Sequence, residues 1–532
     1  MINLLVTGIL ATCSRNSVGS AYLEQDHLYS KNGALEVTFK YQTATDPNNN
    51  ILFCYVTPDN KQSPTLHIYP GDSLKLTLVN DVANNGTIGL NVAQCGVTPL
   101  SASSTNVHFH GTDTLPICQS DEVVKTVIES GQTFTYNLQI PQNESPGLYW
   151  MHPHIYGFSE NALLGGASAA IIIEGIENVQ PEVSELKQRI ITIRDNLVPG
   201  SQSGAPTWDL SMNYIPIPFP VYTTVKMSMS PNGKELFRVL NAAADSILNL
   251  ALIYDDKQQP LQLVELDGVA VNSDGDSKKG ISQTQNTILL GPGARASFIV
   301  NAPGVEIKNA TFATLFVDTG PAGDSDPDRP LAQILLSSVA DSLTSVPKTT
   351  GDNFKRSSDD YPSPSTTRIL YFSEAPSDPN DKDSEPDFFI SEKDEKPQKF
   401  TPGQAPSIDT TLGDVEDWII ENRATEIHVF HLHTMHFKLL ERDGQAVSNS
   451  EQQVLDTTVI PYWKGEGNPF PSIKVRIRFN IAGDIMYHCH ILGHEDAGMM
   501  AYVRVGVNEK SISGMSNIKA TAVLSLILCN LT

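Results

Sequence analysis

The chain has 532 residues, with 60 acidic and 36 basic side chains and a formal net charge of −24. This length is too great for one ordinary hydrophobic core and predicts about two to four domains. The excess of negative charge argues against a nucleic-acid partner and favours solubility or the attraction of cationic substrates.

The N-terminal end carries a short apolar run, NLLVTGILATC at residues 3–13. Because small and polar residues follow it, residues 1–21 are interpreted as a secretory signal that is cleaved between Cys13 and Ala21. A secreted or extracellular protein is therefore expected. Triplets that begin at Asn85, Asn143 and Asn309 fit N-glycosylation acceptors.

Short segments of alternating apolar and polar residues recur along the chain, while long amphipathic helical patterns are scarce. This period of two predicts β-strands that bury one face. The clearest segments are residues 34–42, 65–81, 132–141, 234–242, 287–303, 417–422 and 474–480. Repeated all-β sandwich domains are the expected fold.

Two boundaries divide this pattern. One is expected near residue 180, after an apolar run, and the other lies between about residues 340 and 410, where Ser, Asp and Pro are frequent. The mature chain is therefore divided into residues 22–178, 179–345 and 346–508, with an acidic linker at the start of the third domain.

A second apolar run, residues 520–531, lies near the C-terminal end and is too short to span a bilayer as a helix. Small residues upstream of it support the interpretation of residues 509–532 as a processed lipid-anchor signal. A disordered, cleavable or partly buried tail is the alternative, so cell-surface anchoring stays open. The protein is otherwise expected to be a monomer.

Six cysteines are present, and two of them, Cys13 and Cys529, lie in the predicted signal and tail. If Cys489 is a metal ligand, Cys54, Cys95 and Cys118 remain. Such an odd set allows one disulfide and one free thiol in an oxidising compartment. The sequence leaves open which two of the three pair.

Ten of the 13 histidines fall in four tight groups, and the middle third of the chain contains none. The groups are His108 with His110, His152 with His154, His428 with His431 and His433, and His488 with His490 and His494. Two groups lie early and two lie near the C-terminal end, so the ends of the chain must meet if one site is formed. His27, His67 and His436 lie outside the groups and are interpreted as surface or packing residues.

On an extended strand, residues i and i+2 project from the same face. Four His-x-His pairs therefore supply eight imidazoles, which suit two copper ions with three ligands each and a third with two. The same geometry makes Cys489 point away from His488 and His490, toward a different metal site. A closed structural zinc site does not match one cysteine among ten histidines.

A copper electron-transfer site needs two imidazoles, one thiolate and a weak axial ligand, often methionine. Cys489, His494 and Met499 have suitable local spacing, and His428 can supply the second imidazole. The main chain on either side of Cys489 then gives a short route for electrons to the flanking histidines. One-electron donors can in this way feed a four-electron reduction.

At these four groups, in this order, the sequence resembles the multicopper oxidase family of laccases, ascorbate oxidases, ferroxidases and bilirubin oxidases. The resemblance extends to residues 237–242 (FRVLNA), 291–295 (GPGAR) and 417–422 (DWIIEN), and covers nearly all of residues 35–508. It implies three consecutive cupredoxin-like β-sandwich domains of Greek-key type and four copper ions.

The resemblance also implies a ligand for each copper. The type 1 copper takes His428, Cys489 and His494, with Met499 axial. The type 2 copper takes His108 and His431, one type 3 copper takes His110, His152 and His490, and the other takes His154, His433 and His488. Val429 stands where the family usually has proline, and we expect only a small backbone effect.

Two carboxylates near the motifs are candidates for relaying protons to reduced oxygen. They are Asp121, after the first motif, and Glu495, beside His494. Asp113 competes for the role of Asp121. Ordinary surface acids are the alternative interpretation of both candidates.

The leading functional hypothesis is a laccase-like oxidase that removes single electrons from phenols, aromatic amines or similar reductants and reduces dioxygen to water. A metal-ion oxidase acting on ferrous or cuprous ions is the first alternative, although the chain has no long Met-rich insert. A non-catalytic copper-binding protein is the second, and the presence of every copper ligand argues against it.

Overall fold

The computed structural model describes residues 13–82, 93, 95–96, 100–198, 205–271, 282–339, 341–347, 361–381, 384–448 and 453–507. Within these residues the regular secondary structure is almost entirely β-strand, so the all-β prediction is confirmed. The helices are short: α1 Ser159–Leu164, α2 Ile176–Val179, η1 Pro181–Val183 and α3 Leu492–Asp496. In the described part of the chain, none has the length and apolar character that a membrane crossing requires.

The first sandwich pairs a four-stranded sheet of order β3-β2-β5-β7 with a five-stranded sheet of order β1-β4-β9-β8-β6. Its strands are β1 His27–Tyr29, β2 Ala34–Thr45, β3 Ile51–Val56, β4 Thr65–Ile68, β5 Ser73–Asn80, β6 His108–His110, β7 Thr133–Gln139, β8 Gly147–His152 and β9 Ala169–Ile173. Alternate residues of β7, among them Phe134 and Tyr136, are buried, as the period of two predicts.

The second sandwich has an eight-stranded sheet of order β12-β11-β10-β14-β21-β17-β18, with β19 on β17, and a six-stranded sheet of order β13-β23-β22-β15-β16, with β20 on β15. Its strands are β10 Lys187–Leu197, β11 Trp208–Met212, β12 Ile215–Ile217, β13 Val225–Met229, β14 Lys234–Asn241, β15 Leu248–Tyr254, β16 Lys257–Gln259, β17 Leu261–Leu266, β18 Val269–Ala270, β19 Gln283–Gln285, β20 Ile288–Leu290, β21 Arg295–Asn301, β22 Ala310–Thr314 and β23 Arg329–Leu336. Phe237, Phe298 and Phe312 lie in its core.

The third sandwich has a seven-stranded sheet of order β25-β24-β27-β33-β29-β30, with β31 on β29, and a five-stranded sheet of order β26-β35-β34-β28-β32. Its strands are β24 Thr366–Pro376, β25 Pro386–Glu392, β26 Ile408–Thr411, β27 Val415–Asn422, β28 His428–Leu432, β29 Phe437–Arg442, β30 Gln445–Ala446, β31 Val454–Leu455, β32 Thr457–Ile460, β33 Ser472–Arg478, β34 Gly483–Cys489 and β35 Met500–Gly506. The predicted division of the chain at residues 178 and 345 stays a prediction.

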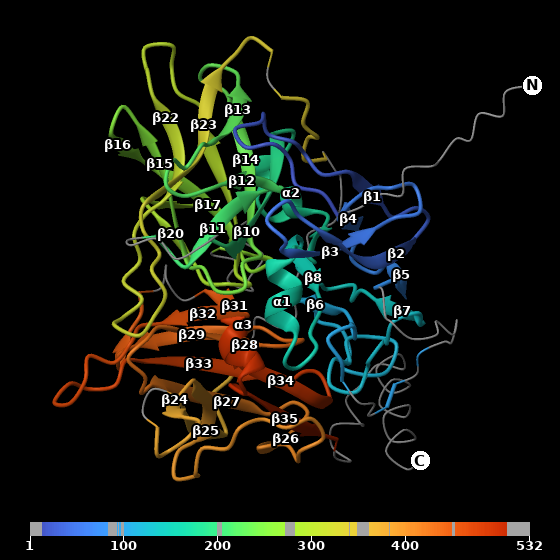
Figure 1. Cartoon of the computed structure of the whole chain (residues 1–532), viewed down its shortest axis with the longest axis vertical. Coiled ribbons are helices and arrows are strands. Elements are labelled where there is room, and N and C mark those ends of the chain that lie inside the picture. Colours follow the sequence, from blue (N-terminus) through green and yellow to red (C-terminus); the bar gives the residue numbers. More distant parts are fainter. Residues whose placement is uncertain are drawn as a thin grey trace, which may run out of the picture.

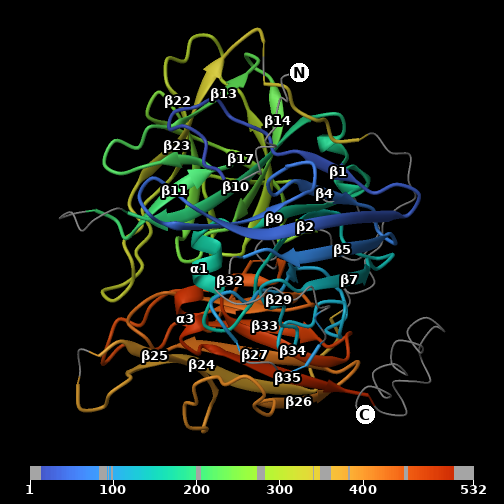
Figure 2. The same ribbon diagram turned by 45° about the vertical axis from the view of Figure 1, so that its right-hand side comes forward.

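The first and second sandwiches lie above the third, as Figures 1 and 2 show. Helices α1 and α3 contact each other where the three units meet. The Ser159 and Glu160 backbone N–H groups of α1 donate to the Asp496 carboxylate at 3.2 and 3.0 Å. This contact brings an early segment against a late one, as the histidine groups require.

The cysteine prediction is wrong. Cys13 forms a disulfide with Cys54, and Cys95 forms one with Cys118. Cys489 is the one free thiol within the described ranges. Three cysteines were left for pairing because Cys13 was assigned to a signal segment that is cleaved off. Cleavage after Cys13 would leave Cys54 without its partner. Residues 1–12 of the predicted signal, Asn85 and residues 509–532 of the tail lie outside the described residues.

Candidate metal centre

Strand pairing brings the histidine groups together two by two. In the first sandwich, His108 of β6 lies opposite His152 of β8. In the third, His431 of β28 lies opposite His488 of β34. The two pairs of strands meet across the interface between the sandwiches, where the His108 ring stacks on His433 at 3.8 Å.

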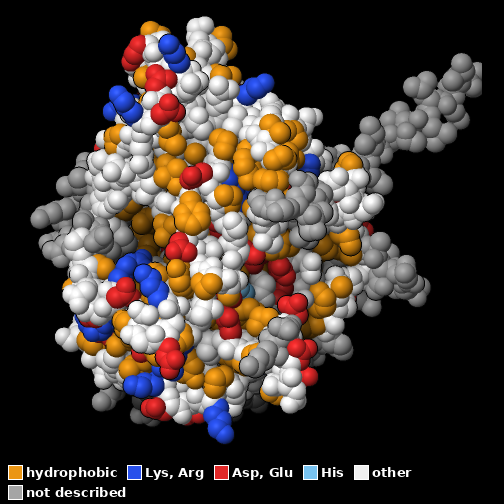
Figure 3. Space-filling view, turned by 60° about the vertical axis from the view of Figure 1, so that its left-hand side comes forward, with side chains coloured by type: hydrophobic (Ala, Val, Ile, Leu, Met, Phe, Trp, Pro, Cys, Tyr) orange, Lys and Arg blue, Asp and Glu red, His pale blue; other side chains and the backbone are white. Residues whose placement is uncertain are grey.

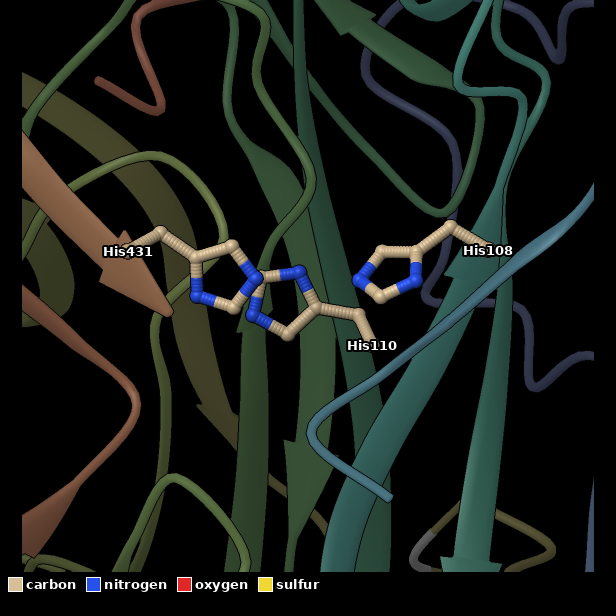
Figure 4. Close-up of side chains that lie close together, drawn as sticks. All are labelled: His108, His110 and His431. Carbon is tan, nitrogen blue, oxygen red and sulfur yellow. The ribbon is translucent and has the colours of Figure 1, made fainter. Parts of the chain in front are cut away.

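A second stacked pair, His110 on His431, has ring centroids 3.9 Å apart (Figure 4). All eight imidazoles expected at the dioxygen site are buried. They form groups whose ring nitrogens lie within 4.8 Å of one another: His108, His110 and His431; His110, His152 and His490; and His154, His433 and His488. The structure therefore brings the four pairs into one centre.

Several of these rings use only one of their two nitrogens in a hydrogen bond, and the other nitrogen faces the centre. The Nδ1 atoms of His152, His431 and His488 lie 2.8–2.9 Å from main-chain carbonyl oxygens, to which they donate. Several opposite ring nitrogens are buried with no hydrogen-bond partner in the part of the chain described. They are His108 Nε2, His110 Nδ1, His152 Nε2, His431 Nε2 and both ring nitrogens of His490. Orphaned imidazole nitrogens that converge in this way fit copper.

Burial lowers the pKa of most of these imidazoles well below the ordinary value, and the neighbouring rings lower it further. Burial also lowers the pKa of His488, to about 4. The rings are therefore neutral at physiological pH. Neutral imidazole is the form that binds a metal.

Cys489 lies in a separate group with His428 and His494, on the other side of its strand as predicted. Its Sγ is 3.6 Å from His428 Nδ1 and 3.8 Å from His494 Nδ1, and the two Nδ1 atoms are 3.1 Å apart. Burial raises the pKa of the Cys489 thiol. A thiolate at this position therefore needs a cation beside it, which a bound copper provides.

Met499 lies next to this group. Its side chain is fully buried in the core that also contains Cys489. Its carbonyl oxygen accepts a hydrogen bond from the Cys489 N–H at 3.1 Å, and its own N–H donates to the His494 carbonyl at 2.9 Å. The backbone of the predicted axial residue is thus tied to two of the other predicted ligands.

Both proton-relay candidates lie against the imidazole centre. Asp121 is buried and accepts hydrogen bonds from His108 Nδ1 at 3.0 Å and from the Phe109 N–H at 2.8 Å. Burial raises its pKa well above the ordinary carboxyl value. Asp113, the competing candidate, lies 3.5 Å from His436 Nδ1 instead.

Glu495 is also fully buried, with Oε1 3.7 Å from His154 Nδ1 and 3.3 Å from the Ser159 hydroxyl. Burial raises the pKa of this carboxyl, and the nearby Asp496 raises it further. Its Oε2 has no hydrogen-bond partner among the described residues. Glu495 is therefore not an ordinary surface acid.

The sequence analysis missed an ion pair behind the centre. The Arg295 guanidinium, from the second sandwich, donates two hydrogen bonds of 2.7 Å to the Asp456 carboxylate of the third. Asp456 Oδ1 lies 3.2 Å from His110 Nε2, and the Asp456 carbonyl accepts from His431 Nδ1. The Arg295–Asp456 ion pair thus orients His110 of the first sandwich and His431 of the third. The GPGAR segment that contains Arg295 was noticed only as a family resemblance.

Two further carboxylates hold the outer edges of the Cys489 group. His428 Nε2 lies 3.2 Å from Glu374 Oε1, and His494 Nε2 lies 3.2 Å from Glu426 Oε1. Burial raises the pKa of Glu426 far above the ordinary value, and the charge of Glu374 raises it further. Glu426 therefore favours its protonated form at neutral pH. The position of Glu426, two residues before His428, is the sequence feature that could have pointed to its role.

The comparisons with known proteins agree with this geometry. A family model described as multicopper oxidase matches residues 54–177, and a second with the same description matches residues 372–509. The chain belongs to the multicopper oxidase family. Members of this family are copper oxidoreductases that use dioxygen.

Curated relatives match this chain over a short stretch. Multicopper oxidase mco of Staphylococcus aureus is 34% identical over 114 residues, which are 20% of this chain and 23% of the relative. The protein of the same name from Staphylococcus haemolyticus is 34% identical over 113 residues, with the same coverage. The match thus spans 23% of the length of these relatives.

Solved structures resemble the whole fold. A multicopper oxidase from Campylobacter jejuni, described as a metallo-oxidase, has a TM-score of 0.66 at 20% identity and covers 92% of this chain and 96% of its own. McoA from Aquifex aeolicus has a TM-score of 0.65 at 17% identity and covers 93% and 100%. At these identities the likeness shows the fold, and the prediction of cupredoxin-like sandwiches is confirmed.

Proposed function

We propose that this multicopper oxidase couples the one-electron oxidation of phenols or similar small reductants to the four-electron reduction of dioxygen to water. One observation carries the proposal. The Cys489 thiol lies with His428 and His494, while the imidazoles of His488 and His490 lie in the other centre. Two buried ligand groups are thus joined through three consecutive residues.

Copper, when bound, supplies the one-electron transfer from the donor and the redox chemistry of dioxygen. His428, Cys489 and His494 would hold one ion, with Met499 beside them, and the eight other imidazoles would hold three more. Four copper ions per chain are therefore proposed. The hydrogen-bond partners of the histidine ligands, such as Asp121 beside His108, fix which ring nitrogen faces each ion.

Dioxygen reduction to water consumes protons, and the chain places carboxyls where protons are needed. Glu495 Oε1 lies beside His154, and Asp121 lies beside His108. Burial favours the protonated form of both groups. We assign them the task of holding protons at the edge of the imidazole centre.

The electron donor would approach the Cys489 group through its carboxylate edge. Glu374 and Glu426 are partly exposed, with side-chain exposures of 18% and 10%, and the His494 side chain beside Glu426 is 12% exposed. Figure 3 shows acidic side chains gathered around a hollow on one face of the molecule. A phenol loses a proton together with its electron, and an ionised carboxylate beside the imidazoles can accept that proton.

Oxidation of ferrous or cuprous ions is the second candidate, and the same carboxylates favour it. A metal-ion substrate needs oxygen ligands next to the electron acceptor, which Glu374 and Glu426 could provide. The Campylobacter jejuni neighbour is described as a metallo-oxidase, whereas an Ochrobactrum neighbour with a TM-score of 0.63, at 16% identity, is described as laccase-like. The complete ligand set argues against a non-catalytic copper-binding protein.

We further propose a secreted, glycosylated monomer whose C-terminal tail serves as a lipid-anchor signal. The two disulfides support an oxidising compartment.

Oxygen uptake by the copper-loaded protein tests the function. Phenols, aromatic amines, ferrous ions and cuprous ions are supplied side by side, and copper content is measured in the same samples. We expect uptake with phenols at the highest kcat/KM. Uptake with metal ions alone would favour the second candidate. No uptake at four bound copper ions would overturn the oxidase proposal.

A further inference from the structure

A second group of titratable side chains lies in the first sandwich, outside the copper ligands. His27 Nδ1 is 2.7 Å from His67 Nε2, and His67 Nδ1 is 2.6 Å from Glu174 Oε1. The parallel pairing of β1 with β4 and of β4 with β9 brings the three segments that carry these residues side by side. The Tyr29 ring stacks on His67 at 4.3 Å. The sequence analysis interpreted both histidines as surface or packing residues, but they form one hydrogen-bonded row.

The row fixes the direction of its hydrogen bonds. The Glu174 carboxylate accepts the hydrogen bond from His67 Nδ1, which leaves His67 Nε2 to accept from His27 Nδ1. His27 then donates from Nδ1, and its Nε2 carries an unshared electron pair. Burial, and to a smaller extent the neighbouring His67, lower the pKa of His27 to about 4, so this ring is neutral near pH 7.

The free nitrogen of His27 faces a carboxylate. His27 Nε2 is buried, lacks a hydrogen-bond partner among the residues described, and lies 3.9 Å from Glu24 Oε1. Glu24 is fixed in turn, because its Oε2 accepts from the Tyr22 hydroxyl at 2.7 Å and its Oε1 from the Ile190 N–H at 3.1 Å. An imidazole nitrogen and a carboxyl oxygen thus face each other across a gap too long for a hydrogen bond. Burial raises the pKa of Glu24 to about 7, so a metal ion that binds at pH 7 must displace a proton from part of the molecules.

A metal ion fits this gap. Zinc lies about 2.0–2.2 Å from imidazole nitrogen and carboxylate oxygen, so two such ligands on a tetrahedral ion are about 3.4 Å apart. The two groups would have to approach by only about half an ångström. Imidazole with carboxylate suits zinc or copper(II).

Solvent can supply the remaining ligands. A pocket of about 620 Å³ opens beside Glu24 and His27. Its walls also include Asn16, Tyr214 and Thr344, so it lies between the N-terminal segment and residues of the second sandwich. Water in this pocket can complete the coordination of an ion that the protein holds by two side chains.

We propose that Glu24 and His27 bind a divalent transition-metal ion of the zinc(II) or copper(II) class, supported by His67 and Glu174. The site is separate from the copper centres and does not depend on the proposed oxidase function. Binding fastens the segment before β1 to β10, since the backbone of Ile190 already holds Glu24. This metal site would therefore stabilise the junction of the first and second sandwiches.

Zinc chloride titrated into the copper-loaded protein at pH 7, followed by calorimetry, tests the site. We expect one zinc ion per chain to bind without loss of copper, and the thermal midpoint to rise. His27→Gln and Glu24→Gln should each weaken this binding at least tenfold. Glu174→Gln should weaken it about tenfold to a hundredfold through the supporting row.

The matched control is Asp26→Asn, which removes an acidic group from the same pocket wall and should leave zinc affinity unchanged. Glutamine at position 27 can still donate to His67, so the variant is expected to fold, and circular dichroism checks this. Equal zinc binding by the wild type and His27→Gln, no binding by the wild type, or zinc uptake only by displacement of copper would each overturn the proposal.

Discussion

The backbone N–H of Val429 donates a hydrogen bond to the Sγ atom of Cys489 at 3.4 Å. Proline, the residue expected at this position from the family resemblance, has no N–H to donate. Hydrogen bonds to the cysteine sulfur tune the potential of a type 1 copper. The sequence analysis expected only a small backbone effect from Val429, but the structure places its N–H on the ligand sulfur.

Val429→Pro should lower the reduction potential of the copper ion that we propose at Cys489. Removing the N–H leaves more electron density on the thiolate, which favours the oxidised ion. A redox titration followed by the visible absorption of the copper–thiolate group measures the change. Val429→Ile keeps the N–H and serves as the control. Equal potentials in the wild type and Val429→Pro would show that the hydrogen bond has no such effect.

Cys489→Ser should remove the copper ion that we propose at Cys489 and leave the three that we propose at the imidazole centre. The substitution deletes the only thiolate of its group. His488 keeps its position through the pairing of β34 with β28, and His490 through the hydrogen bond from its N–H to the Val429 carbonyl. We expect about three copper ions per chain by metal analysis, no blue absorption and loss of donor oxidation. Donor oxidation at a wild-type rate would contradict the proposed role of Cys489.

Arg295→Met should destabilise the protein strongly. The substitution leaves the Asp456 carboxylate buried without the guanidinium that pairs with it, which costs about 3–5 kcal/mol in comparable sites. Thermal unfolding measures the loss. The double variant Arg295→Met with Asp456→Leu removes both charges and should recover part of the stability. A double variant no more stable than Arg295→Met would contradict this explanation.

Much of the site could be predicted from the sequence, because the rules that place its residues act between near neighbours in the chain. Residues two apart share a face of a strand, so the His-x-His pairs and the opposite direction of Cys489 were predictable. Arg295 and Asp456 were not, because 161 residues separate them in the chain and only the docking of two sandwiches joins them. Cys13 was misjudged for a different reason: its apolar surroundings also fit a secretory signal, and only the fold shows its pairing with Cys54.

Glu374→Gln should separate the two candidate substrates. If phenols are the donors, loss of this carboxylate removes a proton acceptor, and kcat/KM should fall by about a hundredfold, within the range of general base catalysis. Ferrocenemethanol gives up an electron without a proton, so its oxidation should change less than about threefold.

Steady-state oxygen uptake with both donors and with ferrous ions makes this comparison. Glutamine keeps the size of the side chain and an oxygen that accepts from His428 Nε2, so the copper group should stay intact, as the visible spectrum checks. If the metal ion is the true donor, KM for ferrous ions rises instead, because an anionic ligand is lost, and phenol oxidation is unaffected. A similar fall for all three donors would indicate a change at the copper itself and would count against both roles of Glu374.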